Sequence, residues 1–361
     1  MLNASSMSKA LEGLNLFERI KEHTSAPTIL YDGSAAEFIR QNTDRISGII
    51  CDPIDVAMQG GEHKAESTDI IVASLEDEAN LVSHLRDRHG SRVYGLVGGW
   101  ALALSLGLQH PDQISALDQT KTRAPRLTYA VVCTARSGSS WLCSLLRSTG
   151  ILGAPKEHLR PPVVLMAQHE DVVGLAFRNW LDHAPIAFQT DGVFGTKIID
   201  NFVADFWPHL TVDAAQHVTD ALAGFKIIHL ERTDKCMQAV SEYFARNTNI
   251  WHLRDGRSPD GHRDARDKLE YNFQALKTIF SRFVTNEERV RSAIARSGNA
   301  SIHLTYEALE ADPVGEVRRI AAFLTGKDMT ELSVHQERYK KMADHLNITF
   351  AERLRADLKR R

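Results

Sequence analysis

The chain has 361 residues, of which 43% are hydrophobic and 25% charged, close to the usage of ordinary globular proteins. This composition excludes a wholly disordered chain, and the length predicts one large or two ordinary domains. The 43 Lys and Arg residues nearly balance the 46 Asp and Glu residues, so the formal net charge is only −3. The chain therefore lacks the overall basic charge that favours nucleic-acid partners, although a local anion site stays compatible with it.

The N-terminal residues and the cysteines indicate the compartment. The first 24 residues contain no basic start followed by an apolar block, so they do not form a recognisable signal peptide. No apolar run is long and uninterrupted enough to span a membrane. The four cysteines, none at a CxxC spacing, support neither a zinc or redox motif nor a disulfide scaffold. We therefore expect a cytoplasmic protein without a transmembrane segment.

The first 120 residues alternate short apolar runs with helical patterns. The runs predict strands at 28–31, 46–51, 69–73 and 92–97, and the patterns predict helices at 35–42, at 76–89 and from 98 onward. This alternation indicates an α/β domain with a largely parallel sheet. Its loops carry Asp32, Asp52, Asp55 and His63, which could form a site, but solvated residues at strand ends explain them better, so no role is assigned to this domain. A polar stretch that ends at Pro125 then predicts three parts: an N-terminal domain (1–120), a linker (121–126) and a C-terminal domain (127–361).

A strand, a loop of small residues and a helix follow the linker. Residues 127–134 are β-branched and apolar, and residues 141–149 place Trp141, Leu142, Leu145, Leu146 and Thr149 on one helical face. The loop between them reads Ala-Arg-Ser-Gly-Ser-Ser. Its backbone N–H groups and the helix dipole favour an anion, and its serine hydroxyls and Arg136 add donors. This arrangement suits a phosphate or a phosphosulfate.

Other interpretations of this loop stay open from the residues alone. An ordinary turn with a helix-capping serine explains the loop equally well. The GxxxxGK[ST] pattern is absent and no lysine enters the helix, which disfavours a nucleotide-dependent kinase. A non-catalytic nucleotide-sensing module is the third interpretation.

A second segment strengthens the prediction of an anion site. Residues 225–231 form a predicted strand that ends at Arg232, and the helix after it carries Ser241. Open α/β sheets bind ligands at the carboxyl ends of their strands, where Arg232 is expected. His229 points away from Ile228 and Leu230 along this strand, so we expect a hydrogen-bonded core or interface histidine.

Four segments together resemble the Stf0 sulfotransferases, which are bacterial enzymes that use 3′-phosphoadenylyl sulfate (PAPS). The four segments are residues 134–142 (TARSGSSWL), Gly150 with Pro155-Lys-Glu157, residues 194–197 (FGTK) and residues 232–241 (RTDKCMQAVS). The resemblance covers about residues 127–330. It implies a P-loop-like α/β domain whose central parallel sheet is flanked by helices. It also implies PAPS as the sulfuryl donor, no metal, and a hydroxyl of a carbohydrate or glycan as the acceptor.

The resemblance also assigns roles to single residues. The family's 5′-phosphosulfate loop matches Arg136, Ser137, Gly138, Ser139 and Ser140, and its 3′-phosphate pair matches Arg232 and Ser241. Glu157 matches a carboxylate proposed as the catalytic base, and Lys197 matches a lysine at a strand end. The resemblance thus implies Glu157, Lys197 and Arg136 as catalytic residues. His158 is a rival base, and a purely structural role for Lys197 stays open.

The sequence departs from the family pattern after Glu157. The family has aromatic residues there, whereas this chain continues His-Leu-Arg-Pro-Pro. We therefore expect the acceptor to be a sugar or glycan other than the one that family members with those aromatic residues use. A charged loop at 254–266 is either solvated surface or a lid. Residues 302–307 predict a late strand that ends in Tyr-Glu, and Asp312-Pro313 predicts a helix start. We expect no nucleic-acid partner, and a homodimer is one assembly open to the chain.

Overall fold

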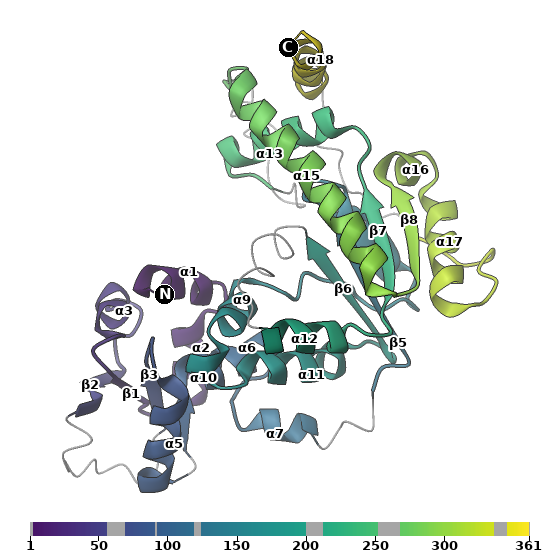
Figure 1. The fold of residues 1–361 in the computed structure, drawn as a ribbon. Helices are drawn as coiled ribbons and strands as arrows, with labels where there is room; N and C mark the ends of the chain where they lie inside the picture. Colours follow the sequence, from purple (N-terminus) through teal and green to yellow (C-terminus); the bar gives the residue numbers. More distant parts are fainter. Residues whose placement is uncertain are drawn as a thin grey trace. The chain divides into compact units, whose positions relative to one another are not determined.

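The computed structural model describes residues 3–55, 69–90, 92–118, 124–199, 212–251, 268–335 and 345–360. They form an α/β protein with two parallel four-stranded sheets (Figure 1). The chain divides into two compact units. The first comprises Met1–Ala124, Leu159–Phe188 and His209–Ala221, and the second comprises Pro125–His158, Gln189–Pro208 and Leu222–Arg361. The first unit thus includes two segments that follow the predicted linker in sequence. Most of that linker lies outside the described residues, and the predicted domain boundaries stay a prediction.

The first unit contains a parallel sheet in the order β2-β1-β3-β4. Its strands are β1 (Thr28–Tyr31), β2 (Ile50–Pro53), β3 (Ile70–Ala73) and β4 (Val93–Gly95). The helices before the linker are α1 (Ala4–Glu12), α2 (Leu16–His23), α3 (Ala36–Gln41), α5 (Glu78–His89), the π-helix η1 (Leu96–Ala101), α6 (Leu102–Ser105) and α7 (Gln113–Asp118). Those after it are α9 (Pro161–Gln168), α10 (Glu170–Val173), α11 (Ala176–Phe188) and α12 (Val212–Ala221). The predicted α/β character of the N-terminal region is confirmed.

Two predicted elements of this unit differ in detail. The strand predicted at 46–51 begins only at Ile50, because residues 46–49 form a turn in which Ile49 N donates to Ile46 O at 2.8 Å. The helix predicted from residue 98 begins at Leu96 as a π-helix. One buried cluster of the sheet comprises Leu30, Ile54, Ile70, Val72, Leu85 and Val93.

The second unit contains a parallel sheet in the order β6-β5-β7-β8. Its strands are β5 (Leu127–Cys133), β6 (Val193–Ile199), β7 (Lys226–Glu231) and β8 (Ser301–Thr305). Its helices are α8 (Ser139–Ser148), α13 (Lys235–Thr248), α15 (Phe273–Ser297), α16 (Tyr306–Ala311), α17 (Pro313–Thr325) and α18 (His345–Lys359). The chain proceeds from β5 to β6 on one side and then to β7 on the other. The carboxyl end of β5 is therefore the switch point at which such sheets bind ligands.

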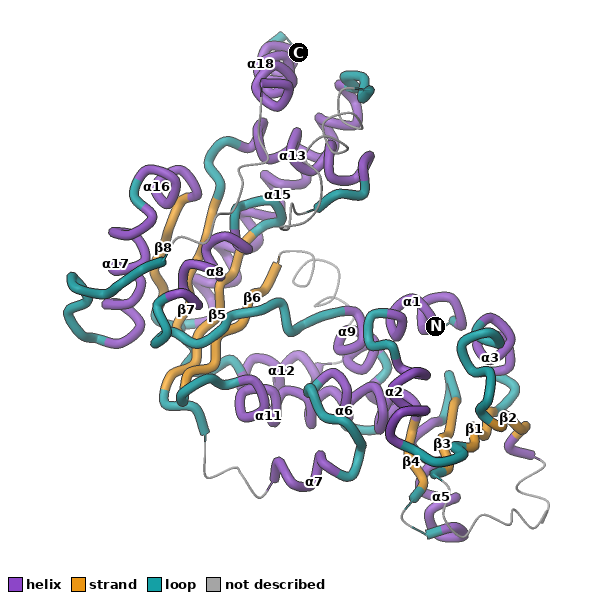
Figure 2. The backbone as a smooth tube through the Cα atoms, turned by 180° about the vertical axis from the view of Figure 1, so that it is seen from behind, coloured by secondary structure: helices purple, strands orange, loops and turns teal. Residues whose placement is uncertain are grey.

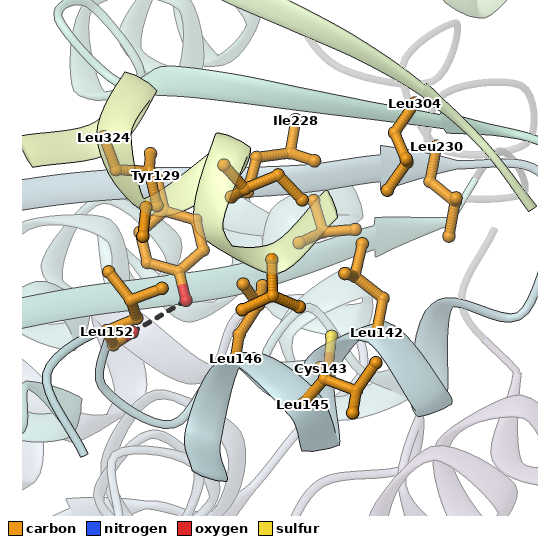
Figure 3. Packing of buried hydrophobic residues seen from close by; sticks show 14 of the residues in the cluster. Tyr129, Leu142, Cys143, Leu145, Leu146, Leu152, Ile228, Leu230, Leu304 and Leu324 are labelled. Carbon is orange, nitrogen blue, oxygen red and sulfur yellow. Dashed lines mark hydrogen bonds between the residues drawn. The ribbon is translucent and has the colours of Figure 1, made fainter. Parts of the chain in front are cut away.

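Helices cover both faces of this sheet (Figure 2). On one face, α8 and α17 pack against inward side chains of β5, β7 and β8 in one buried cluster (Figure 3). Within it, the Tyr129 hydroxyl donates to Leu152 O at 2.8 Å. On the other face, α15 contacts β7 through Glu287 and His229. The layered arrangement explains why β5 is apolar on both sides, and it confirms the fold class predicted for this region.

The end of the sheet corrects one further prediction. The last strand stops at Thr305 rather than at Glu307, because the Thr305 side chain accepts a hydrogen bond from Ala308 N at 3.1 Å and caps α16. The helix start at Asp312-Pro313 is confirmed, since Asp312 accepts from Gly315 N at 2.8 Å. Among the described helices, none combines the length and apolar character needed to cross a membrane.

Candidate functional site

The loop between β5 and α8 has the geometry of an anion site. We call residues 134–140 the phosphate loop. Arg136 and Gly138 have positive φ values of 61° and 87°, which bend the backbone just before the N-terminus of α8. A Cβ atom at Gly138 would lie 2.5 Å from the Tyr306 ring. Both the left-handed backbone and the close ring therefore require glycine at this position.

The hydroxyl groups of the phosphate loop are placed as potential donors. Ser137 is fully buried, and its Oγ has no hydrogen-bond partner among the described residues. A buried hydroxyl without a partner is costly, and an anion bound in the loop would satisfy it. Ser139 and Ser140 begin α8, whose N-terminal N–H groups also favour an anion.

Ser140, Glu157 and Lys197 come together at one end of the loop, and we call them the lysine cluster. Lys197 lies near the carboxyl end of β6 and is 7% exposed. Its Nζ lies 3.3 Å from Ser140 Oγ and 3.6 Å from Glu157 Oε2. The segment that carries Glu157 runs parallel to β6, since Lys197 N donates to Lys156 O at 2.8 Å. Residues that are 57 and 40 positions from Lys197 in sequence thus meet at one sheet edge.

Arg136, Arg232 and Ser241 come together at the other end, and we call them the arginine cluster. Arg136 Nε donates to Ser241 Oγ at 3.1 Å, and its Nη1 donates to Trp251 O at 2.6 Å. Arg232 Nη1 donates to Arg136 O at 3.3 Å. The Arg232 guanidinium stacks on the Tyr306 ring at 4.6 Å, while its buried Nε has no partner in the described part of the chain.

The arginine cluster concentrates positive charge in a partly buried place. Burial and the neighbouring Arg232 guanidinium lower the pKa of Arg136. Two like charges in such a place repel each other, and a bound dianion offsets this repulsion. Arginine is suited to phosphate because its planar fork can donate two hydrogen bonds. The residues present therefore fit a phosphate group.

The rival base His158 also lies beside β6. Its Nδ1 is 3.2 Å from Thr196 Oγ1, and its ring packs 5.4 Å from the Phe194 ring. Of the two neighbours, Glu157 is the one that pairs with Lys197. The predicted lid at 254–266 lies outside the described residues.

Two residues of this region were missed at the sequence level. Tyr306 supports both Gly138 and Arg232, as described above. Glu307 accepts hydrogen bonds from Thr233 N and Asp234 N at 3.1 Å each, which holds the turn after Arg232 and lowers the pKa of Glu307. The sequence feature that could have indicated these two residues is the Tyr-Glu pair at the end of a strand, since Arg232 follows another strand of the same sheet.

The prediction for His229 is confirmed. It is 6% exposed and its Nε2 lies 2.7 Å from Glu287 Oε1. His229, Glu231 and Glu287 also form the one group in the described residues whose ligand atoms could converge on a metal, all lying within 4.8 Å. Lys235 pairs with both carboxylates, and Arg291 pairs with Glu231. These cations neutralise the two carboxylates and hold the pKa of Glu231 at about 2, which supports a structural role for the group.

Comparisons with known proteins identify the family. Residues 128–357 match the family model described as Stf0 sulphotransferase. The chain belongs to this family. It is also 27% identical over 218 residues to the trehalose 2-sulfotransferase of Mycolicibacterium smegmatis (strain ATCC 700084 / mc(2)155), a match that covers 50% of this chain and 78% of that protein. The resemblance inferred from the four sequence segments is confirmed, and the Stf0 protein described here is a sulfotransferase and hence an enzyme.

Proposed function

We propose that this Stf0 sulfotransferase takes its sulfuryl group from PAPS and transfers it to a hydroxyl of a carbohydrate or glycan. The observation that carries the proposal is that Lys197 contacts one end of the phosphate loop, while Arg136 and Arg232 meet at the other. PAPS has two anionic groups, a 5′-phosphosulfate and a 3′-phosphate. A loop with a cationic side chain at each end suits such a molecule.

In the proposed complex, the phosphate loop and the arginine cluster bind different parts of the donor. The backbone N–H groups and hydroxyls of residues 137–140 hold the 5′-phosphosulfate. Arg232 and Ser241 hold the 3′-phosphate. The contact between Arg136 and Ser241 supports a role for the Arg136 guanidinium at the 3′-phosphate, in addition to the role expected for this residue in the phosphosulfate loop.

The lysine cluster supplies the proposed catalytic groups. PAPS supplies a sulfuryl group on a phosphate leaving group. Glu157 accepts the proton of the acceptor hydroxyl as the new S–O bond forms and the bond to the phosphate breaks. Lys197, which pairs with Glu157 and contacts Ser140, stabilises the negative charge that develops on the transferring and leaving oxygens. The second product is adenosine 3′,5′-bisphosphate.

The acceptor class rests on the relative rather than on the geometry. The similar protein of M. smegmatis is a trehalose 2-sulfotransferase, which supports a sugar hydroxyl. The segment after Glu157 reads His-Leu-Arg-Pro-Pro in place of aromatic residues, which supports a sugar other than trehalose.

Two measurements test this proposal. Purified enzyme is incubated with PAPS and a panel of sugars, and products that gain one SO₃ group are sought by mass spectrometry. Calorimetry in EDTA then compares adenosine 3′,5′-bisphosphate with ATP, which lacks the 3′-phosphate. We expect a sulfated sugar and tighter binding of the bisphosphate. Binding of ATP as tight as that of the bisphosphate would contradict the assigned donor.

A further inference from the structure

A buried polar network lies beneath the phosphate loop and the arginine cluster. Its centre is Glu287, a residue of α15 that is 2% exposed. Its two carboxylate oxygens contact three other elements: His229 Nε2 of β7 at 2.7 Å, Lys235 Nζ of α13 at 3.0 Å and Thr134 Oγ1 of the phosphate loop at 3.1 Å. One side chain thus binds the elements that follow both central strands, β5 and β7.

Lys235 extends this network to the arginine cluster. Its Nζ, besides contacting Glu287, donates to the backbone carbonyl of Arg232 at 2.6 Å. The carboxylate of Glu287 is therefore linked through one ammonium group to the backbone of Arg232. Through this link, the network reaches the residue proposed to bind the 3′-phosphate.

Thr134 extends the network to the phosphate loop. It is fully buried and is the first residue after β5. The amide of Gln238 donates to Thr134 Oγ1 at 2.8 Å and to Ala135 O at 2.6 Å. The start of the phosphate loop is therefore fixed by side chains of α13 and α15 rather than by the loop itself.

Attraction for the donor gives no reason for an acid at this place. A carboxylate close to a phosphate site repels the phosphate and weakens its binding. Replacement of this acid by a neutral residue would on that ground strengthen anion binding. The benefit of the acid must come from the groups that it orders.

We propose that Glu287 is a positioning residue that fixes the phosphate loop relative to the turn after Arg232, so that both anionic ends of the donor are bound together. This inference rests on the proposed function. It predicts that loss of Glu287 weakens ligands that bridge the two segments more than ligands that contact only one.

The test compares three single variants and one double variant of the full chain. Glu287→Gln removes the central charge, and Thr134→Val removes the hydroxyl that links the loop to Glu287. The matched control is Glu231→Gln, which removes a buried charge from the same cluster. Glu231 pairs with Arg291, His303 and Lys235. The phosphate-loop residue Thr134 bonds instead to Glu287, so Glu231→Gln leaves that bond in place. Binding of adenosine 3′,5′-bisphosphate and of AMP is measured by calorimetry, and folding is checked by thermal melting.

We expect Glu287→Gln and Thr134→Val to weaken bisphosphate binding about tenfold, while AMP binding changes about threefold or less. Glu231→Gln should bind the bisphosphate within about twofold of the wild type or more tightly, because it removes a repulsive charge. In the Glu287→Gln background, Thr134→Val should have little additional effect, because both substitutions weaken the same contact between residues 134 and 287.

Three results would overturn the inference. Wild-type protein that binds no bisphosphate removes the proposed function and this inference with it. A wild type that binds, beside folded Glu287→Gln and Thr134→Val variants with unchanged affinity, overturns the positioning role alone. Equal losses for AMP and the bisphosphate indicate general loosening and also overturn it. Should Glu287→Gln fail to fold, Thr134→Val decides by the same criteria.

Discussion

Replacement of Arg232 by Ala gives the most direct test of the arginine cluster. A charge-assisted pair between arginine and phosphate contributes about 1.5–3 kcal/mol net. Removal of Arg232 also relieves its repulsion of Arg136, which places the loss toward the lower part of this range. We therefore expect adenosine 3′,5′-bisphosphate to bind about 10- to 100-fold more weakly. Binding of ATP, which lacks the 3′-phosphate, should change little.

The fold should survive this substitution. The Arg232→Ala variant loses one hydrogen bond of 3.3 Å and the stacking on Tyr306. Such a stacked pair contributes about 0.5–1 kcal/mol. The melting temperature should then fall by only about 2–4 °C. Calorimetry and thermal melting are run beside Arg319→Ala, an exposed arginine that pairs with Glu316. Collapse of the melting temperature with unchanged affinity of the folded fraction would make Arg232 a structural residue and refute the reasoning.

Three further predictions concern single residues. Glu157→Gln should lower turnover about 10²- to 10⁴-fold with little change in PAPS affinity, and His158→Ala should cost much less; steady-state kinetics that show the reverse order would make His158 the base. Gly138→Ala should weaken donor binding in calorimetry at least tenfold, because its φ of 87° is unfavourable for alanine and the new Cβ would meet Tyr306. Burial raises the pKa of Glu78 to about 7. Between about pH 4.5 and 7, this carboxyl therefore binds more protons in the folded protein than in the unfolded protein. Over that range the unfolding free energy of the protein should fall by about 3 kcal/mol, and Glu78→Gln should abolish this slope in denaturant titrations; an unchanged slope would exclude Glu78 as its source.

The parts of the site that could be predicted from the sequence are local. The strand at 127–134, the small-residue loop and the helix after it follow each other within about 20 residues, and each is determined by its own side chains. The cap at Asp312 is local in the same way, since its hydrogen bond spans three residues. Periodicity and turn chemistry report such short-range structure well.

The convergence of distant residues depends on the order of the strands. Glu157 meets Lys197 because the segment around Lys156 runs beside β6, and Lys197 meets Ser140 because β6 pairs with β5. Neither pairing can be predicted from the hydrophobic pattern of the separate segments. The sequence could suggest these partners only through the resemblance to a family, and the geometry now supplies the distances.

Glu287 shows how much a pattern can indicate without naming a partner. Leu276, Ile279, Phe283 and Val290 repeat at helical spacing and form the buried face of α15. Glu287 lies on that face between Phe283 and Val290, and it is 2% exposed, whereas the side chain of its neighbour Glu288 is 71% exposed. A carboxylate on the buried face of a helix requires partners, because an unpaired buried charge is strongly destabilising. His229 was likewise predicted to be a core or interface histidine that requires a hydrogen-bond partner. Only the sheet and helix packing brings the two side chains within 2.7 Å, and the same packing joins them to the phosphate loop.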